Sequence, residues 1–540
     1  MKITKIVVAL VLAAALIVGV SALSWEEREA EPKAQIYTLD EDSVGYLEEI
    51  DHIQNLGVIS IDDNVFKAEY EAGFIQGKLQ KEQIISARDN CWDSCYLTDP
   101  SFTFANQILP TEEDMLAAQA VLLMNYNYTL NYMQTHSDPT VRRNLHRLLF
   151  RLIGIYHGTK LHEPASLNFS GEWVPPKDYF SPAEMTLGYE TPSLSFMDVY
   201  FINAFMDLFY VVDQEHTSRC SAFVKKTDND IFIAHNSWMC FLDQSMAASF
   251  YINGDFFTVN AVYPGILASM SDFGYNNKGI MFDETTHYYT YTEPKSQSLW
   301  MFWRATLAEQ FAGSLDEFYE YLSLEASGTY MNGYMVVDTK TGEIGLVEMS
   351  YQTFVYFKPN GNNSNQVITK PENQSKEYDH ELLQPDYILG VNFPVSQLIR
   401  DELKAVENRP ARRTQFLAQI DDVTDIESAK ALITYTCPVE PLSIYGRWDL
   451  GYGTTTTPQT IPDGAADAKA VSASMASYVS DLNGILDLKS QNRSFWMKFG
   501  TPVIKGKPFI WSESQWRGQK LRDVPDVVDG DFHLLNLYIK

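Results

Sequence analysis

The pattern of apolar residues in this 540-residue chain changes near residue 220. Before that point, apolar side chains recur at helical spacing. One such face carries Val141, Leu145, Leu148, Leu149 and Leu152. After it, short aromatic and β-branched runs alternate with turn signals such as Asn253-Gly254, which is typical of β-hairpins. Helices, then strands with further helices between them, predict an α+β fold in which antiparallel sheets are covered by helices.

Three helices are expected before residue 220. The first covers residues 70–88, and the second begins at Thr111, whose hydroxyl can cap it together with Asp114 three residues later. The third carries the leucine-rich face, and its interleaved arginines are interpreted as its solvated side. These arginines are Arg142, Arg143, Arg147 and Arg151. Residues 358–380 are polar and are predicted to form an exposed loop.

Residues 1–22 have the form of a signal peptide. Lys2 and Lys5 precede an apolar run, and Val20-Ser21-Ala22 supplies small residues for cleavage. The run is short for a membrane span, although a retained signal anchor is the alternative. No later segment resembles a membrane span, so we expect no stable membrane insertion. The chain is therefore predicted to enter the secretory pathway, for an extracellular or lysosome-like destination.

The charge of the chain is strongly acidic. It has 41 Lys and Arg against 70 Asp and Glu, a formal net charge of −29. Such a balance argues against a nucleic-acid partner, because phosphates need basic side chains. It suits an acidic compartment, although ordinary solubility explains it equally well. Sequons that predict a glycoprotein occur at Asn127, Asn168, Asn362, Asn373 and Asn492.

The chain has five cysteines, an odd number, so at least one should lack an intramolecular partner in an oxidising compartment. Cys91 with Cys95, and Cys240 with Cys437, are the pairs we guess at, which leaves Cys220. A zinc site is not expected, because no second close Cys or His pair accompanies the first. We expect neither a metal nor a cofactor.

Cys220 stands at the head of a predicted strand, far inside the chain. Cleavage of the Arg219–Cys220 bond would release an α-amine beside the thiol. That amine has a pKa of about 8 and can act as the base for the thiol. The alternative is a buried, inert cysteine.

Eight short motifs occur in a fixed order along residues 45–470. They are residues 71–77 (EAGFIQG), 205–208 (FMDL), 220–225 (CSAFVK), 234–238 (AHNSW), 263–265 (YPG), 283–286 (DETT), 327–332 (SGTYMN) and 464–469 (GAADAK). Together they resemble the phospholipase B-like, or lamina-ancestor-type, family of N-terminal-nucleophile hydrolases. Ala234, Arg219 and Gly333 depart from the family pattern, and the chain after Lys469 matches it less clearly.

The resemblance implies an αββα sandwich and self-cleavage before Cys220. Residues 23–219 would then form a mainly helical fragment, and residues 220–540 the catalytic fragment. It also implies hydrolysis of amide or ester bonds, with a lipid acyl group as the favoured substrate; phospholipids, N-acyl amides and peptides all remain open. The oligomeric state is not predicted.

The resemblance also suggests helpers for Cys220. Asn332 is the first choice as the side-chain donor to an oxyanion, and Asn236 is the second; either could instead cap a turn. His235 is a candidate for tuning the thiol, with a core histidine as the alternative.

Three further residues are candidates for substrate binding. Trp238 would line an acyl pocket or fill the core, and Thr285 is singled out by its motif alone. Arg413 would meet a substrate carboxylate or phosphate, although a solvated arginine is the simpler interpretation.

Two rival functions stay open. One is a papain-like thiol hydrolase that pairs Cys220 with a separate histidine such as His287 and needs no cleavage. The other is a non-catalytic secreted binding protein that has the same fold.

Overall fold

The computed structural model describes most of the chain between residues 34 and 536. The described ranges are 34–97, 109–212, 220–243, 247–253, 255–268, 272–289, 293–325, 327–359, 367–370, 377–407, 410–439, 442–447, 463–476, 493–500, 508–514 and 516–536. The predicted signal peptide and Arg219 lie outside them.

Eleven of the described strands form one sheet, in the order β1-β2-β3-β7-β8-β9-β10-β11-β12-β13-β14. Their bounds are Gln35–Thr38, Ser43–Ile50, Ile53–Ser60, Ala247–Asn253, Phe256–Val262, Phe273–Asn276, Ile280–Thr286, Asn332–Asp338, Glu343–Met349, Phe354–Pro359 and Val367–Lys370. Neighbouring strands are antiparallel except β3 and β7, which pair in parallel. That parallel pair joins the chain before Cys220 to the chain after it.

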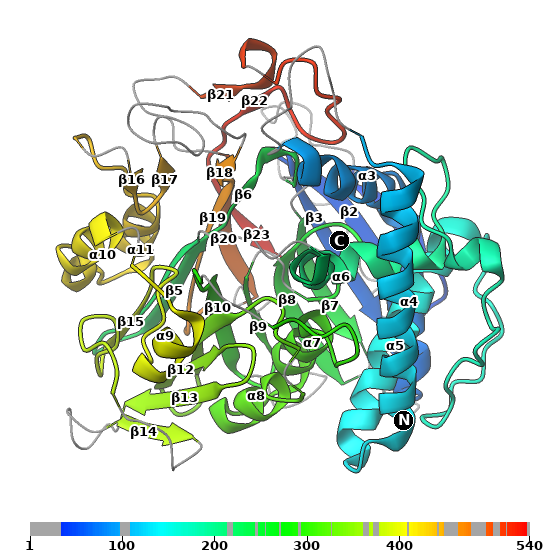
Figure 1. The fold of residues 1–540 in the computed structure, drawn as a ribbon, viewed down its shortest axis with the longest axis horizontal. Coiled ribbons are helices and arrows are strands. Elements are labelled where there is room, and N and C mark those ends of the chain that lie inside the picture. The colour runs from blue at the N-terminus through cyan, green and yellow to red at the C-terminus, as the bar shows by residue number, and fades with distance from the viewer. Residues whose placement is uncertain are drawn as a thin grey trace, which may run out of the picture.

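A second sheet has six described strands, in the order β15-β4-β5-β19-β20-β23, and every pair in it is antiparallel. Its strands are Tyr387–Gly390, Ser221–Lys226, Ile231–Asn236, Asp467–Ser472, Ser494–Phe499 and Phe532–Asn536. Strands β10 and β11 of the large sheet lie against β4 and β5 of this one (Figure 1).

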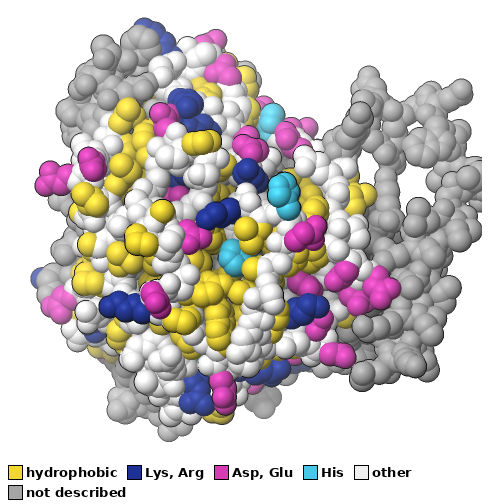
Figure 2. Space-filling model, turned by 90° about the vertical axis from the view of Figure 1, so that its right-hand side faces the viewer, with side chains coloured by type: hydrophobic (Ala, Val, Ile, Leu, Met, Phe, Trp, Pro, Cys, Tyr) yellow, Lys and Arg dark blue, Asp and Glu magenta, His cyan; other side chains and the backbone are white. Residues whose placement is uncertain are grey.

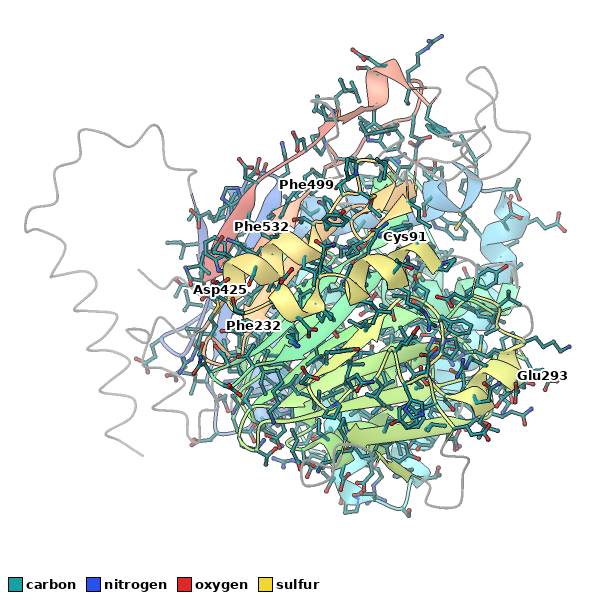
Figure 3. The ribbon with its side chains drawn as sticks, turned by 90° about the vertical axis from the view of Figure 1, so that its left-hand side faces the viewer. Cys91, Phe232, Glu293, Asp425, Phe499 and Phe532 are labelled. Carbon is teal, nitrogen blue, oxygen red and sulfur yellow. The ribbon has the colours of Figure 1, made fainter. Side chains whose placement is uncertain are left out.

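Helices cover the outer sides of both sheets (Figure 1). The main ones are α2 Val65–Leu79, α3 Lys81–Leu97, α4 Glu112–Thr135, α5 Pro139–Lys160, α6 Phe196–Val212, α7 Met301–Phe311, α8 Leu315–Leu322, α9 Gln397–Leu403, α10 Pro410–Leu417 and α11 Ile426–Ile433. Helix α2 lies against β2 and β3, while α7 and α8 lie against the middle strands of the large sheet. Helix α11 covers β5 and β19, and Figure 3 shows Asp425 at its start, with Phe232 on the sheet nearby.

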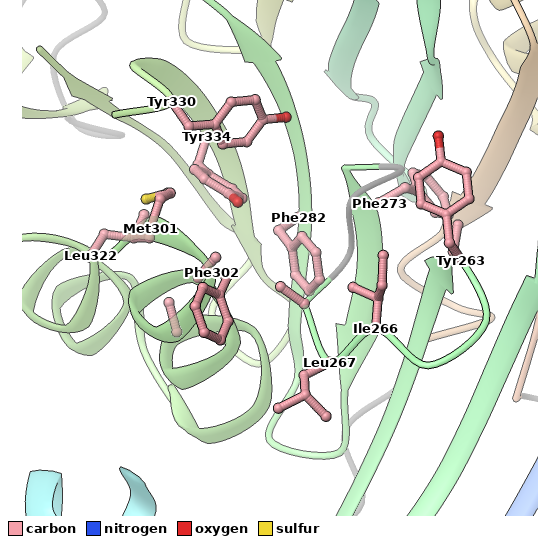
Figure 4. Close-up of a cluster of buried hydrophobic side chains, with 14 of the residues drawn as sticks. Tyr263, Ile266, Leu267, Phe273, Phe282, Met301, Phe302, Leu322, Tyr330 and Tyr334 are labelled. Carbon is pink, nitrogen blue, oxygen red and sulfur yellow. The ribbon is translucent and has the colours of Figure 1, made fainter. Parts of the chain in front are cut away.

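The core between the large sheet and its helices is aromatic. The rings of Phe282, Phe318 and Tyr334 contact one another, with centroids 5.5–6.4 Å apart. Figure 4 shows Tyr330 and Tyr334 near Phe282, with Phe302 on the neighbouring helix. This packing fixes the ends of β10 and β11, where the polar residues of the candidate site begin.

Glycines bring α2 and α5 into close contact. A Cβ atom on Gly73 would lie 2.2 Å from the Arg151 carbonyl oxygen, and one on Gly154 would lie 2.1 Å from the Tyr70 carbonyl oxygen. Such distances exclude any side chain, so glycine is required. The 71–77 motif therefore has a packing role.

Most of the predicted local structure is confirmed. Thr111 caps α4 in a capping box with Asp114, and β7 and β8 form the predicted hairpin. The first predicted helix is in fact two, because α2 ends at Leu79, with Gln80 as its C-cap, and α3 begins at Lys81. The predicted loop at 358–380 includes a strand, Val367–Lys370, paired to β13.

Two predictions are wrong. Arg147 and Arg151 are not solvated: their side chains are 1% and 2% exposed, and both pair with the buried Glu69, at 3.1 and 2.7 Å. In the described residues no disulfide joins the cysteines. Cys95 instead donates a hydrogen bond to the Cys91 carbonyl oxygen, one helical turn earlier.

One face of the molecule shows how its charged side chains are distributed. On the face in Figure 2, acidic and basic side chains alternate with apolar ones and form no continuous basic area. No helix in the described ranges has the length and apolar character needed to cross a bilayer.

Candidate active site

Cys220 is buried, with 4% of its surface exposed, and it immediately precedes β4. The guanidinium of Arg412 on α10 donates a hydrogen bond to the Cys220 carbonyl oxygen and another, of 3.1 Å, to the Ser221 hydroxyl. The Ser221 amide donates to the Asn236 side-chain oxygen at 3.3 Å. The backbone at Cys220 is thus held from two sides.

Cys220 lines a pocket of about 80 Å³. Its apolar wall comes from α3, α6 and the segment around β6 (Trp238–Cys240), and includes Ala87, Cys91, Phe205, Met206, Trp238, Leu242, Tyr263 and Ile266. The polar side is made by Asp272, Thr286 and Tyr330, together with Asn90. The thiol therefore lies where an apolar part of a ligand could bind on one side and polar side chains are available on the other.

His235 and Asp272 lie beside the thiol. The Cys220 Sγ, a His235 ring nitrogen and an Asp272 carboxylate oxygen all lie within 4.8 Å of one another, and all three residues are buried. His235 is placed there by strand pairing, because on β5 it lies opposite Ala222 of β4 and Lys469 of β19. Burial and then Lys469 hold the pKa of His235 well below its usual value, so the ring is neutral.

Two carboxyl groups share one hydroxyl next to the thiol. The Tyr330 hydroxyl lies 2.9 Å from Asp272 Oδ1 and 3.1 Å from Glu284 Oε2. Burial raises the pKa of Asp272 to about 7. Burial and the neighbouring Asp272 raise the pKa of Glu284 well above its usual value. The pair therefore holds a proton near neutral pH.

The thiol itself is protonated in the intact chain. Burial raises the pKa of Cys220 well above its usual value, and Asp272 and Glu284 raise it further. The Trp238 backbone and Lys469 act in the opposite direction. Because the thiolate is the nucleophile, the site needs a base or a nearby positive charge before it can react.

Lys469 is the cation that acts on this cluster. Its ammonium group lies 2.7 and 2.8 Å from the two Asp467 carboxylate oxygens and 2.8 Å from the Ser237 hydroxyl. The Ser237 amide in turn donates to Asp467 at 2.8 Å. This fully buried network fixes the turn between β5 and β6, and with it the side of the site that carries His235.

The two asparagines have different surroundings. Asn236 donates to the carbonyl oxygens of Ile433 and Ile444, at 2.8 and 3.0 Å, so both its amide hydrogens are used within the fold. Asn332 is fully buried, and neither side-chain polar atom has a hydrogen-bond partner among the described residues. Asn332 lies opposite Thr286, which lines the pocket. Paired residues project to the same face of a sheet.

The substrate-binding candidates lie in different places. Trp238 lines the pocket, donates to the Asn236 oxygen at 2.9 Å, and lies under the Arg412 guanidinium at 5.0 Å. Thr285 packs towards Gly390 on the other sheet, whereas its neighbour Thr286 lines the pocket.

Arg413 takes part in a separate ion cluster. It pairs with Asp379, Glu407 and Glu381 at 2.8, 2.9 and 3.1 Å. Its guanidinium is therefore already engaged by carboxylates of the protein itself.

Sequence reasoning missed Arg412, Asp272 and Lys469 as site residues. The sequence did contain an indication that Arg412 faces inward, because it lies four residues before the apolar Phe416 on the same helix. Both residues are buried in the structure. Lys469 stood inside a motif that received no chemical role. The sequence around Asp272 did not indicate a site residue, because the pairing of the adjacent strand β9 and the contact with Tyr330 bring it to the thiol.

The structure also bears on the histidine of the papain-like alternative. His235 is the imidazole that lies beside Cys220. His287 follows β10 and lies 3.7 Å from Glu348, and burial lowers its pKa to about 3.

Comparison with known proteins shows the family of this chain. The family model described as Phospholipase B matches residues 53–533, and the chain belongs to this family. Phospholipase-B 81 from Drysdalia coronoides is 22% identical over 497 residues, 81% of this chain and 80% of the relative. Phospholipase B-like protein B from Dictyostelium discoideum is 24% identical over 288 residues, 49% of this chain and about half (46%) of the relative's length.

Among solved structures, the chain is similar to a mutant of conjugated bile acid hydrolase from Clostridium perfringens. That match covers 52% of this chain and 89% of the hydrolase, with 10% identity and a TM-score of 0.27.

Proposed function

We propose that this chain is a self-processing hydrolase whose nucleophile is Cys220, exposed as a new N-terminus by cleavage of the Arg219–Cys220 bond. The observation that carries the proposal is the position of the thiol, between an apolar pocket and the polar cluster of His235 and Asp272. The order of layers, helices outside two facing sheets, is compatible with an αββα sandwich.

In the proposed maturation, the Cys220 sulfur attacks the Arg219 carbonyl carbon and displaces the Cys220 nitrogen, which gives a thioester. Water then hydrolyses the thioester and leaves Arg219 as a carboxylate and Cys220 with a free α-amine and thiol. Arg412 supports this step, because it holds the Cys220 carbonyl and so fixes the direction of the sulfur.

In the proposed catalytic cycle, the α-amine takes the thiol proton as the sulfur attacks the substrate acyl carbon. The leaving amine or alcohol receives that proton, and water then releases the acid from the acyl-enzyme. Asn332 is the proposed donor to the oxyanion, because its buried amide has no other described partner. Asn236 is assigned a positioning role, because both of its N–H groups are already used.

The apolar wall of the pocket favours an acyl chain as the bound part of the substrate. Together with the family, this supports a lipid acyl amide or ester, a class that includes phospholipids and N-acyl amides. The reaction as proposed uses no cofactor. A secretory destination, extracellular or lysosome-like, is proposed from the signal sequence, and glycosylation from exposed Asn127 and Asn168.

A panel of N-acyl amides and phospholipids tests this function. We expect turnover by the processed wild-type chain and by Cys95→Ala, a matched control on α3, but none by Cys220→Ala. Turnover that persists in Cys220→Ala, or its absence across the whole panel in a processed protein, would overturn the proposal. An intact single chain with Cys220-dependent turnover would favour the papain-like thiol hydrolase. A ligand-binding function unchanged in Cys220→Ala would favour the binding protein.

A further inference from the structure

We propose that the Cys220 pocket is also a binding site for a thiophilic divalent cation, with Zn²⁺ as the best fit, held by Cys220, His235 and Asp272. The three donor atoms, one sulfur, one nitrogen and one oxygen, lie within 4.8 Å of one another. These are the ligand types that zinc prefers, at about 2.0–2.3 Å. Tetrahedral bonds of that length separate ligand atoms by about 3.3–3.8 Å, so a contraction of about 1 Å closes the site.

Asp283 is a second, independent observation that points to a cation. Both of its carboxylate oxygens are buried and have no hydrogen-bond partner among the described residues. On β10 it lies opposite Phe273, the residue that follows Asp272. A buried carboxylate without donors is costly, and a nearby cation removes that cost.

The balance of charge leads to the same conclusion. Asp272, Asp283 and Glu284 are each buried, and the ammonium of Lys469 lies 2.7 Å from Asp467. A divalent ion held by Asp272 supplies positive charge close to these buried carboxyl groups.

Binding would switch the site off. On coordination the Cys220 thiol loses its proton and its sulfur lone pair enters the metal bond, so the sulfur cannot attack a carbonyl carbon. This consequence rests on the proposed function, whereas the binding itself does not. The cation would therefore act as a reversible inhibitor of both maturation and turnover, removable by a chelator.

The test uses the full chain, stripped with a chelator and titrated with Co²⁺ as a spectroscopic probe. We expect one equivalent to bind, with a thiolate-to-cobalt charge-transfer band that Zn²⁺ abolishes by displacement. Cys220→Ser should lose the band, and His235→Gln or Asp272→Asn should weaken binding by about tenfold or more. Cys95→Ser, which alters a thiol on α3 that does not line the pocket, should keep both band and affinity.

Thermal unfolding guards against variants that misfold. Zn²⁺ should raise the Tm of the wild type and of Cys95→Ser, and leave the Tm of Cys220→Ser unchanged. No band in folded wild type, a band that survives Cys220→Ser, or Zn²⁺ inhibition without the band would overturn the proposal. N-terminal sequencing after prolonged incubation without metal separates the two claims. A chain that binds the metal but stays uncleaved once the metal is removed contradicts only the proposed function, and a chain that cleaves but does not bind contradicts only the metal site.

Discussion

The guanidinium of Arg412 donates a hydrogen bond to the carbonyl oxygen of Cys220, a residue 192 positions earlier in the chain. The same group also donates to the Val391 carbonyl and to the Asn392 side chain, both at 2.8 Å. One buried arginine therefore ties the start of β4 to the end of β15. The position of the thiol depends on this tie.

Replacing Arg412 by lysine should slow the cleavage before Cys220 by about a hundredfold, because a single ammonium cannot reproduce the geometry of the guanidinium fork. The matched change Arg413→Lys should leave cleavage close to wild type, since its partners Asp379, Glu407 and Glu381 form an ion cluster separate from the Cys220 site. Time courses on a denaturing gel measure both. Equal rates for the two variants would contradict a positioning role for Arg412.

The buried Asn332 amide should matter for turnover and not for stability. Asn332→Leu removes an amide that makes no described hydrogen bond, so we expect kcat to fall by about a hundredfold or more. The free energy of unfolding should change by about 1 kcal/mol or less.

Asn276→Leu is the contrasting control. Its amide donates to the carbonyl oxygens of Glu309 and Ala312, both at 2.9 Å. This variant should lose about 1–3 kcal/mol of stability and keep the kcat of the folded enzyme. A normal kcat in Asn332→Leu would contradict the proposed role of Asn332 as the hydrogen-bond donor to the oxyanion.

The contribution of Asp272 to stability should fall as pH rises from about 4 to about 7. The pKa of Asp272 is raised from 3.8 to about 7 by burial, so across this window the native state keeps a proton that the unfolded state loses. The slope from this one group is at most about 1.4 kcal/mol per pH unit. Glu348, whose pKa burial also raises to about 7, adds to the effect.

Urea unfolding of wild type and Asp272→Asn at pH 5 and pH 7 isolates the contribution of Asp272. We expect the wild type to be more stable at pH 5, and the variant to lose about 2 kcal/mol of that difference. An identical pH dependence in the two proteins would show that Asp272 is not protonated at pH 5 as described.

The two fragments should stay together after cleavage. Strand β3 pairs with β7 along its length, and Arg522 pairs with Asp93 and, at 2.6 Å, with Glu190. Size-exclusion chromatography should therefore give one peak that separates into two bands only on a denaturing gel. Two peaks under native conditions would contradict this.

Local features of the fold were predictable because they depend on neighbouring residues. The Thr111 cap needs only Asp114, and the β7–β8 hairpin needs only its turn. The burial of Arg147 was not predictable in the same way, because its partner Glu69 lies 78 residues away on another helix. From sequence alone, an arginine in a helix is predicted to be solvated unless the carboxylate that pairs with it, far away in the chain, is known.

The same distinction holds for the candidate site. Cys220, His235 and Asn332 stand inside short motifs and were found in the sequence. Lys469 reaches the site only through the pairing of β19 with β5, two strands that lie far apart in the chain. Asp272 lies just before β9, and the packing of the large sheet against the second sheet brings it to the thiol. Of the two adjacent arginines, Arg412 is the one that lies at the Cys220 carbonyl, and only the packing of α10 decides which of them faces inward.

The N-terminal sequence of the large fragment from freshly purified protein tests the central claim most directly. A fragment of residues 220–540 that begins at Cys220, present in wild type and absent in Cys220→Ala, is the predicted result. A fragment that begins at another residue, or the same cleavage in Cys220→Ala, would contradict the account.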